Sequence, residues 1–142
     1  MATYKATSWG RTRRPKHLRD TVPESKQAAT TVTVVASTDL HDDLDSTVAG
    51  ENGYPTENQR FLHVLVKGGT SKSVVIYAYN YAFAEWAPLN ISLGNATMSA
   101  ATATTGGSGE AQMYIFDIAG VDRVAFTSGD APTTTRAACS TF

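Results

Sequence analysis

The residues best placed for chemistry lie in one short segment, Leu40-His41-Asp42-Asp43-Leu44-Asp45. One imidazole and three carboxylates within this segment provide four groups that can bind a metal ion. Calcium loops usually follow a D-x-D-x-D-G pattern, and zinc sites usually add a second histidine or a cysteine, but neither feature occurs here. We therefore predict a solvated acidic loop at His41–Asp45 with no metal ion, although the sequence leaves metal binding open.

Two further carboxylates, Asp117 and Asp122, flank a predicted corner at Ala119-Gly120. A retaining glycoside hydrolase needs two carboxyl groups about 5 Å apart in an open cleft lined by aromatic side chains. Beside a tight turn, an ion pair or a turn cap explains these two residues more simply. We expect that structural role for both.

The remaining catalytic patterns are incomplete. No G-x-S-x-G motif marks a nucleophile, and Gly106-Gly107-Ser108-Gly109 lacks the lysine and the following helix of a phosphate loop. Cys139 has no basic neighbour in the sequence, so we expect an inert, buried thiol. His63 lies inside the strongest apolar run, where we expect a core or interface histidine bonded to the backbone. We therefore predict that the chain is not an enzyme and needs no cofactor.

Composition limits the remaining classes of function. The chain has 142 residues, a formal net charge of −1 and one cysteine. This length supports one domain with its own core, and a single cysteine excludes an internal disulfide, which favours synthesis in a reducing cytoplasm. We expect no signal peptide and no association with a membrane, because no apolar stretch approaches the roughly 20 residues that a bilayer requires. The net charge argues against nucleic acid as a partner.

Residues 1–29 are predicted to form an extended basic arm. Pro15 and Pro23 interrupt any helix, and too few apolar residues are present for the segment to fold alone. Such a segment is either a solvated tail or a docking arm. The residues expected to dock are two aromatic anchors and five cations: Tyr4, Trp9, Arg11, Arg13, Arg14, Lys16 and Arg19.

Residues 30–142 are predicted to form a β-sandwich or jelly roll of about seven or eight strands. Strands are expected near residues 30–36, 60–67, 72–80, 81–89, 113–118, 121–126 and 133–142, with a weak strand at 91–93 and a thin one at about 96–102, separated by Gly, Pro and Asn turns. Residues 60–67 and 72–80 have the pattern of a hairpin. The segment 111–126 has the pattern of two buried strands that meet at a tight corner, where Gly120 can take a positive φ.

An acidic loop, residues 37–58, follows the first predicted strand. Its charge is opposite to that of the arm, so the arm of one copy could bind the loop of a neighbour, although two solvated segments explain the pattern equally well. Tyr77, Tyr79 and Tyr81 alternate, and Trp86 follows. If these four side chains share an exposed face, they form a platform for a sugar; if that face is buried, they belong to the core or to a subunit interface.

Several segments resemble capsid decoration (cement) proteins of tailed bacteriophages. They are Glu85-Trp86-Ala87-Pro88-Leu89, the small polar run that ends at Gly109, and a strand–glycine–strand unit from Ile115 to Phe126. The resemblance implies a structural virion protein without catalytic residues, made in the host cytoplasm, that sits as a homotrimer on the capsid and clamps neighbouring copies of the major capsid protein. A carbohydrate-binding β-sandwich module and a phage tail or fibre component are the alternatives.

Overall fold

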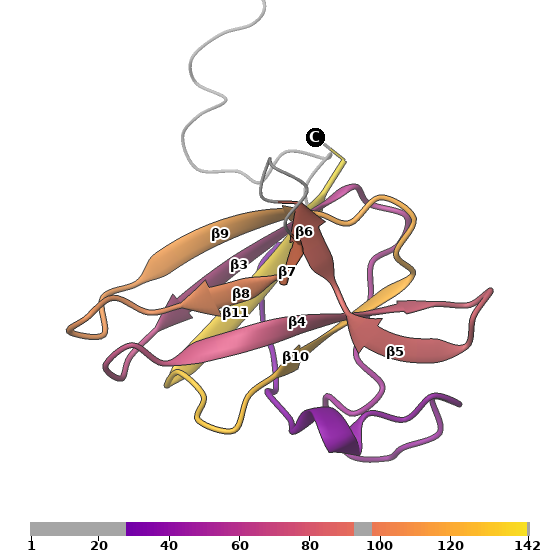
Figure 1. The fold of residues 1–142 in the computed structure, drawn as a ribbon, viewed down its shortest axis with the longest axis horizontal. Helices are drawn as coiled ribbons and strands as arrows, with labels where there is room; N and C mark the ends of the chain where they lie inside the picture. The colour runs from indigo at the N-terminus through magenta and orange to yellow at the C-terminus, as the bar shows by residue number, and fades with distance from the viewer. Residues whose placement is uncertain (1–27, 93–97, 142) are drawn as a thin grey trace, which may run out of the picture.

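The computed structural model describes residues 28–92 and 98–141, which form an all-β sandwich (Figure 1). Sheet A contains four strands in the spatial order β1 (Thr30–Thr31), β11 (Thr134–Ser140), β3 (Phe61–Lys67) and β9 (Gln112–Asp117). Sheet B has the order β2 (Tyr54–Pro55), β10 (Arg123–Thr127), β4 (Ser73–Asn80) and β5 (Glu85–Pro88), and β8 (Thr102–Thr104) also pairs with β4. A short ribbon contains β6 (Asn90–Ser92) and β7 (Met98–Ala100), and a 3-10 turn spans Ser37–Asp39.

The hydrophobic core lies between the two sheets. Side chains alternate across a strand, so every second residue of β3 and β4 points inward. The inward residues of these two strands are almost fully buried, and β10 adds Val124 and Phe126 from the same sheet as β4. The residues of β3 and β4 that are buried in this core are Leu62, Val64, Val66, Val74 and Ile76. The predicted fold class is therefore confirmed.

The predicted hairpin between residues 60–67 and 72–80 is wrong. Strand β3 pairs with β11 and β9 in sheet A, whereas β4 pairs with β10, β5 and β8 in sheet B. Both strands place an apolar face in the same core, and stacked sheets lie only about 10 Å apart, a distance that the link 68–72 can cross. The chain therefore steps from one sheet to the other where the sequence predicts a return within one sheet.

The corner at Gly120 is confirmed, but it also joins two different sheets. Gly120 has a φ of 85°, and Val121 N donates to the carbonyl of Ile118 at 2.9 Å. Strand β10 is buried as predicted, whereas β9 lies at the edge of sheet A with Met113 65% and Ile115 58% exposed. The prediction of two buried strands is therefore wrong for β9, because an edge strand has one neighbour and one open side.

The first predicted strand, residues 30–36, is paired only at Thr30–Thr31 and again as a single parallel bridge at Val35. Val32 N donates to Thr135 O in sheet A, and Val35 N donates to Phe126 O in sheet B. The segment therefore crosses from one sheet to the other and cannot continue as one strand. No helix within the described ranges has the length and apolarity needed to cross a bilayer.

Candidate functional site

The acidic loop, residues 37–58, divides in two: its residues before β2 lie against the side of sheet B that faces away from the core, whereas Tyr54–Pro55 is strand β2 of that sheet (Figure 1). Its first part is attached to the sheet through two aromatic side chains. The hydroxyl of Tyr79 donates to the carbonyl of Asp42 at 2.7 Å, and the indole N–H of Trp86 donates to the carbonyl of His41 at 2.9 Å. The backbone N–H of Trp86 also donates to Oδ1 of Asp42 at 3.0 Å. These bonds hold the loop against β4 and β5.

The expected aromatic platform is therefore covered by the chain's own loop. Tyr79 and Trp86 are only 4% and 8% exposed, and their rings lie 5.1 Å apart with Leu40 and Leu44 packed against them. A sugar stacks on an exposed ring face, which neither residue offers. Sequence reasoning left the choice between a sugar platform and a buried core open, and the structure supports the core for these two residues.

The other two members of the expected platform lie in different surroundings. Tyr77 is partly buried and packs against the Tyr79 cluster. Tyr81 is 59% exposed and lies in the turn after β4, because β4 ends at Asn80. The prediction that the three tyrosines share a face requires a strand that reaches Tyr81, and β4 does not reach it; the ring of Tyr81 meets that of Tyr79 edge-on at 5.7 Å.

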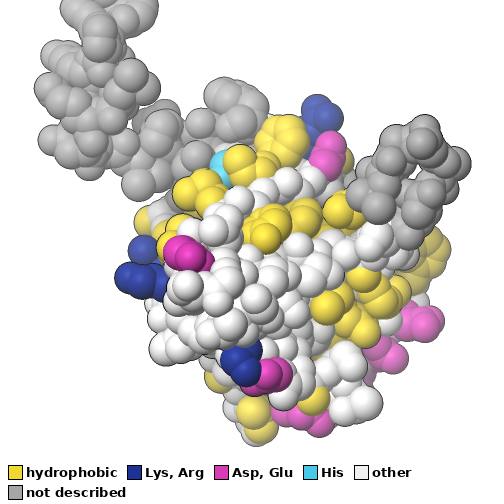
Figure 2. Space-filling model, turned by 60° about the vertical axis from the view of Figure 1, so that its left-hand side comes forward, with side chains coloured by type: hydrophobic (Ala, Val, Ile, Leu, Met, Phe, Trp, Pro, Cys, Tyr) yellow, Lys and Arg dark blue, Asp and Glu magenta, His cyan; other side chains and the backbone are white. Residues whose placement is uncertain are grey.

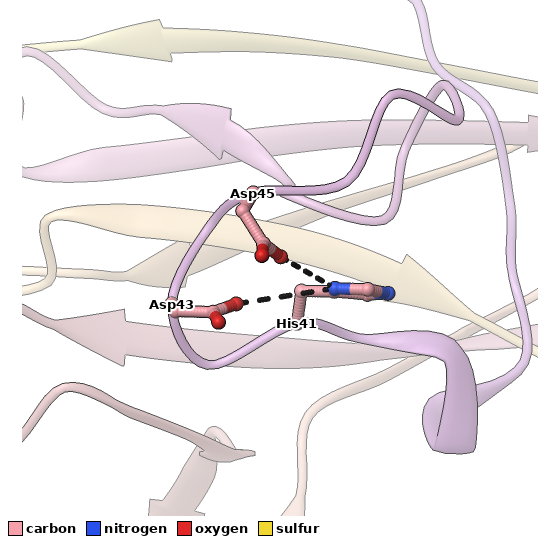
Figure 3. Close-up of side chains that lie close together, drawn as sticks. All are labelled: His41, Asp43 and Asp45. Carbon is pink, nitrogen blue, oxygen red and sulfur yellow. Dashed lines mark hydrogen bonds and ion pairs between the residues drawn. The ribbon is translucent and has the colours of Figure 1, made fainter.

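His41 lies at the centre of the charged part of the loop (Figure 3). Its Nδ1 donates to Oδ1 of Asp45 at 2.8 Å and lies 3.9 Å from Oδ1 of Asp43, while its Nε2 lies 3.6 Å from Oε1 of Glu51. The hydrogen bond to Asp45 raises the pKa of His41 above its ordinary value, and the charges of all three carboxylates add to the effect. The same bond lowers the pKa of Asp45. Protonated His41 therefore serves as an internal counter-ion for the loop.

A metal ion is the alternative occupant of this corner. Potential ligand atoms of His41, Asp43 and Asp45 lie within 4.8 Å of one another. However, the nitrogen nearest the carboxylates already forms a hydrogen bond, and the side chains of Asp43 and Asp45 are 73% and 65% exposed. The carboxylates are exposed, as expected of a solvated acidic loop, while the pairing with His41 was not predicted, and the absence of a metal ion stays a prediction.

The carboxylates beside Gly120 serve the structure as predicted. Asp117 accepts a hydrogen bond from Ala119 N at 3.0 Å and forms an ion pair with Arg60 at 3.3 Å. The hydrogen bond from Ala119 lowers the pKa of Asp117, and Arg60 lowers it further. Asp122 accepts from Tyr81 N at 2.8 Å. Each carboxylate therefore has a turn-capping or ion-pairing partner of its own.

Cys139 and His63 are two further side chains whose surroundings were predicted from the sequence. Cys139 is 5% exposed, and burial raises the pKa of its thiol to about 11, which fits an inert side chain. His63 is partly buried and its Nε2 lies 2.7 Å from the hydroxyl of Ser140 on β11, while a bond from His63 to the backbone stays a prediction. The cross-strand neighbour of His63 is Ala138, so this contact is diagonal and cannot be inferred from the sequence of β3.

The outer face of sheet A is a second candidate surface, and sequence reasoning missed it. Met113 and Ile115 of β9 are exposed beside partly buried Leu65 and His63 of β3, their cross-strand neighbours. Figure 2 shows hydrophobic side chains exposed in several separate groups on the face turned to the viewer. A hollow of about 230 Å³ lies on the outer face of sheet A, and its lining includes Ala29, Leu65, Met113 and Arg136. The near-continuous apolar run of residues 61–66 is the signal that could have indicated an apolar outer face.

Charge is distributed unevenly along the chain. Seven of the 12 lysines and arginines precede residue 28, together with only two of the 13 acidic residues. Residues 1–27 therefore carry a formal charge of +5 and the rest of the chain −6. The predicted docking residues Tyr4, Trp9, Arg11, Arg13, Arg14, Lys16 and Arg19 lie outside the described residues. The described chain begins at Ala28, and Ala29 lines the hollow on sheet A.

Comparison with known proteins gives little further information. No protein-family model matches the chain, and no curated protein matches it. The crystal structure of the SPBc2 prophage-derived protein YomS is similar over 84% of this chain and 98% of that chain, with a TM-score of 0.48 and 17% sequence identity. A likeness of this size carries no argument about function, so the functional argument rests on the residues.

Proposed function

We propose that this chain is a structural virion protein that binds the major capsid protein and stabilises the shell across subunit junctions, as a decoration or cement protein does. The observation that carries the proposal is the position of the basic segment. Residues 1–27 carry a formal charge of +5, and the described chain begins directly after them, with Ala29 lining the hollow on the exposed apolar face of sheet A. A basic segment attached beside an apolar contact surface suits attachment to another protein.

Simple distances support a role for the arm. A fully extended segment of 27 residues reaches at most about 90 Å, which is enough to cross the junction between two neighbouring subunits. Its cations suit an acidic capsid surface, and Tyr4 and Trp9 can serve as aromatic anchors in pockets of the partner. Many copies on one shell multiply a modest contact energy, since each copy that bridges two subunits resists their separation.

A role without catalysis agrees with the chemistry of the described side chains. The groups most able to act as acids or bases, His41, Asp117 and Asp122, are engaged in holding the acidic loop and the turn at Gly120. Cys139 is buried with a raised pKa. These groups are used to build a rigid body, which is what a protein that covers another surface requires.

Co-sedimentation with capsids assembled from the major capsid protein of the same virus tests the proposal. Replacing the anchor in Trp9→Ala is expected to lower affinity at least about tenfold, the loss typical of a buried aromatic anchor. The matched control Phe83→Ala removes an aromatic ring that is 79% exposed on the turn between β4 and β5, and it should bind like the wild type. Equal binding by Trp9→Ala, or no binding by the wild type, would contradict the proposal.

Salt dependence tests the charged part of the arm. Neutralising Arg11, Arg13 and Arg14 together is expected to weaken binding at low salt and to flatten its salt dependence, because exposed charges are screened within about 10 Å at 0.1 M salt. A tail or fibre component is the alternative place in the virion. Antibody labelling of intact particles under the electron microscope distinguishes it, since a decoration protein labels the head.

A further inference from the structure

Strand β9 leaves one side of sheet A open. Within the described ranges β9 pairs only with β3. Ile118 N donates to Arg60 O at 2.7 Å, which fixes the alternation of hydrogen bonds along the pair. Phe116, Tyr114 and Gln112 therefore direct their backbone groups toward β3. Met113, Ile115 and Asp117 direct theirs toward the open side, where they are available to another strand.

The open edge also lacks the features that usually protect one. Natural edge strands tend to be short or to carry lysine, proline or a bulge, because a free edge pairs with other chains. β9 has six residues, Gln-Met-Tyr-Ile-Phe-Asp, with none of these residues. The other sheet edges in the described part, β1, β2, β5 and β8, are two to four residues long. The outward side chains Met113 and Ile115 are apolar and more than half exposed.

We propose that β9 pairs antiparallel with β9 of a second copy of this chain about a two-fold axis. The pairing that uses both apolar residues places Met113 opposite Ile115 of the second copy, with Tyr114 on the axis. All four residues of these two pairs have outward backbone groups, so four N–H···O=C bonds form and the two sheets A join into one. The Met113 and Ile115 side chains of the two copies then pack against one another on the shared outer face.

Charge favours a second copy over the chain's own basic segment. Antiparallel pairing brings the Glu110 end of one strand next to the Arg60–Asp117 end of the other. Arg60 has a 60% exposed side chain and can therefore pair with Glu110 of the second copy as well. Residues 1–27 carry +5 and would meet Arg60, Lys67 and Arg136 of sheet A, which are all exposed. These like charges would repel the basic segment, whereas the two-fold pairing brings Arg60 of each copy next to Glu110 of the other.

This inference does not depend on the proposed function. A two-fold axis gives an even number of copies, so it replaces the homotrimer that the resemblance to decoration proteins implies. The pairing uses the edge of sheet A and leaves the outer face free. In a dimer the two outer faces form one continuous surface with a basic segment at each of its two far edges, since β1 lies at the opposite edge from β9.

The mass of the full-length chain in solution tests the proposal. Light scattering during gel filtration is expected to give the wild type twice the 15.1 kDa of one chain. Met113→Lys places a charge on the edge, at a position exposed enough to leave the fold intact, and should halve that mass. The matched control Phe83→Lys adds the same charge on the exposed turn after β4 and should keep the dimer. A wild type of one-chain or three-chain mass, or a dimeric Met113→Lys, would overturn the pairing.

Chemical cross-linking gives an independent measurement of the same contact. Ile115→Cys, treated with a short bis-maleimide, should yield a covalent dimer, whereas the control Phe83→Cys should stay a single chain. Cys139 does not interfere, because it is buried and its thiol pKa is raised to about 11. Equal cross-linking of the two variants would contradict the proposal. Hydrogen exchange at the amides of Met113 and Ile115 separates a covered edge from an open one: slow exchange in the dimer supports the pairing, and fast exchange contradicts it.

Discussion

Gly53 allows the acidic loop to pack against the aromatic cluster, and its replacement by alanine tests that packing. Gly53 has a φ of 65°, and a Cβ atom there would lie 2.4 Å from Cη2 of Trp86 and 2.5 Å from the carbonyl oxygen of Val124. The second contact is with backbone and cannot be relieved by rotating a side chain. Gly53→Ala therefore adds backbone strain and a steric conflict at one position.

Two other glycines separate these contributions. Gly120 has a φ of 85° but open space around its Cβ position, so Gly120→Ala carries the conformational strain alone, about 1 kcal/mol. Gly107 has open space and no positive φ, so Gly107→Ala should be neutral or stabilise by about 0.5 kcal/mol. The overlap at Gly53 adds about 2 kcal/mol to the strain, giving a total near 3 kcal/mol.

Thermal unfolding followed by circular dichroism measures all three variants. For a chain of this length, 1 kcal/mol shifts Tm by about 3–4 °C. We expect Tm to fall about 10 °C in Gly53→Ala and about 4 °C in Gly120→Ala, and to stay nearly constant in Gly107→Ala. Trp86 emission should also shift to longer wavelength in Gly53→Ala as the loop moves away from the indole. Equal Tm values for Gly53→Ala and Gly120→Ala would refute the packing of the loop on Trp86.

Two further predictions follow from the pKa shifts. The pKa of His41 is raised in the folded chain, so its stabilising effect is complete below its unfolded value of 6.5 and is lost as pH rises through the folded value. Tm should therefore fall as the pH rises above about 6.5, and His41→Gln should remove that part of the slope; an unchanged slope would contradict the loop geometry. The raised pKa of Cys139 predicts that Ellman's reagent at pH 8 labels the native chain only as fast as the chain unfolds. The control Thr141→Cys adds a thiol at an exposed position, and this thiol should react at once.

The strands were predictable from the sequence, but their assignment to sheets was not. The alternation of Leu62, Val64 and Val66 fixes β3 as a strand with one buried face, and Val74 and Ile76 do the same for β4. This alternation is identical whether two strands lie in one sheet or in opposite sheets. The deciding contacts of β3 are with β11, about 70 residues later in the chain, and no local pattern reports them.

The two candidate surfaces show the same limit. The His41–Asp45 contact spans only four residues, so the spacing could have indicated it, although we predicted only a solvated acidic loop from the sequence. The burial of Tyr79 depends on Asp42, which lies 37 residues earlier, and therefore could not be inferred from alternation within β4. Met113 and Ile115 have the composition of buried residues, and only the topology shows that β9 lies at an edge.

The two outer faces of the sandwich differ in a way that bears on function. The outer side of sheet B is closed by its own loop, and hydrogen bonds from Tyr79, Trp86 and Arg123 fix that loop in place. Sheet A has no such cover within the described residues, although burying apolar area there would stabilise by roughly 25 cal/mol per Å². The chain's own loop covers the outer face of sheet B, so the apolar surface that a partner can bury lies on the outer face of sheet A. The described chain begins beside that same face, where Ala29 lines the hollow, so we look for the partner there and not at the His41 corner of the loop.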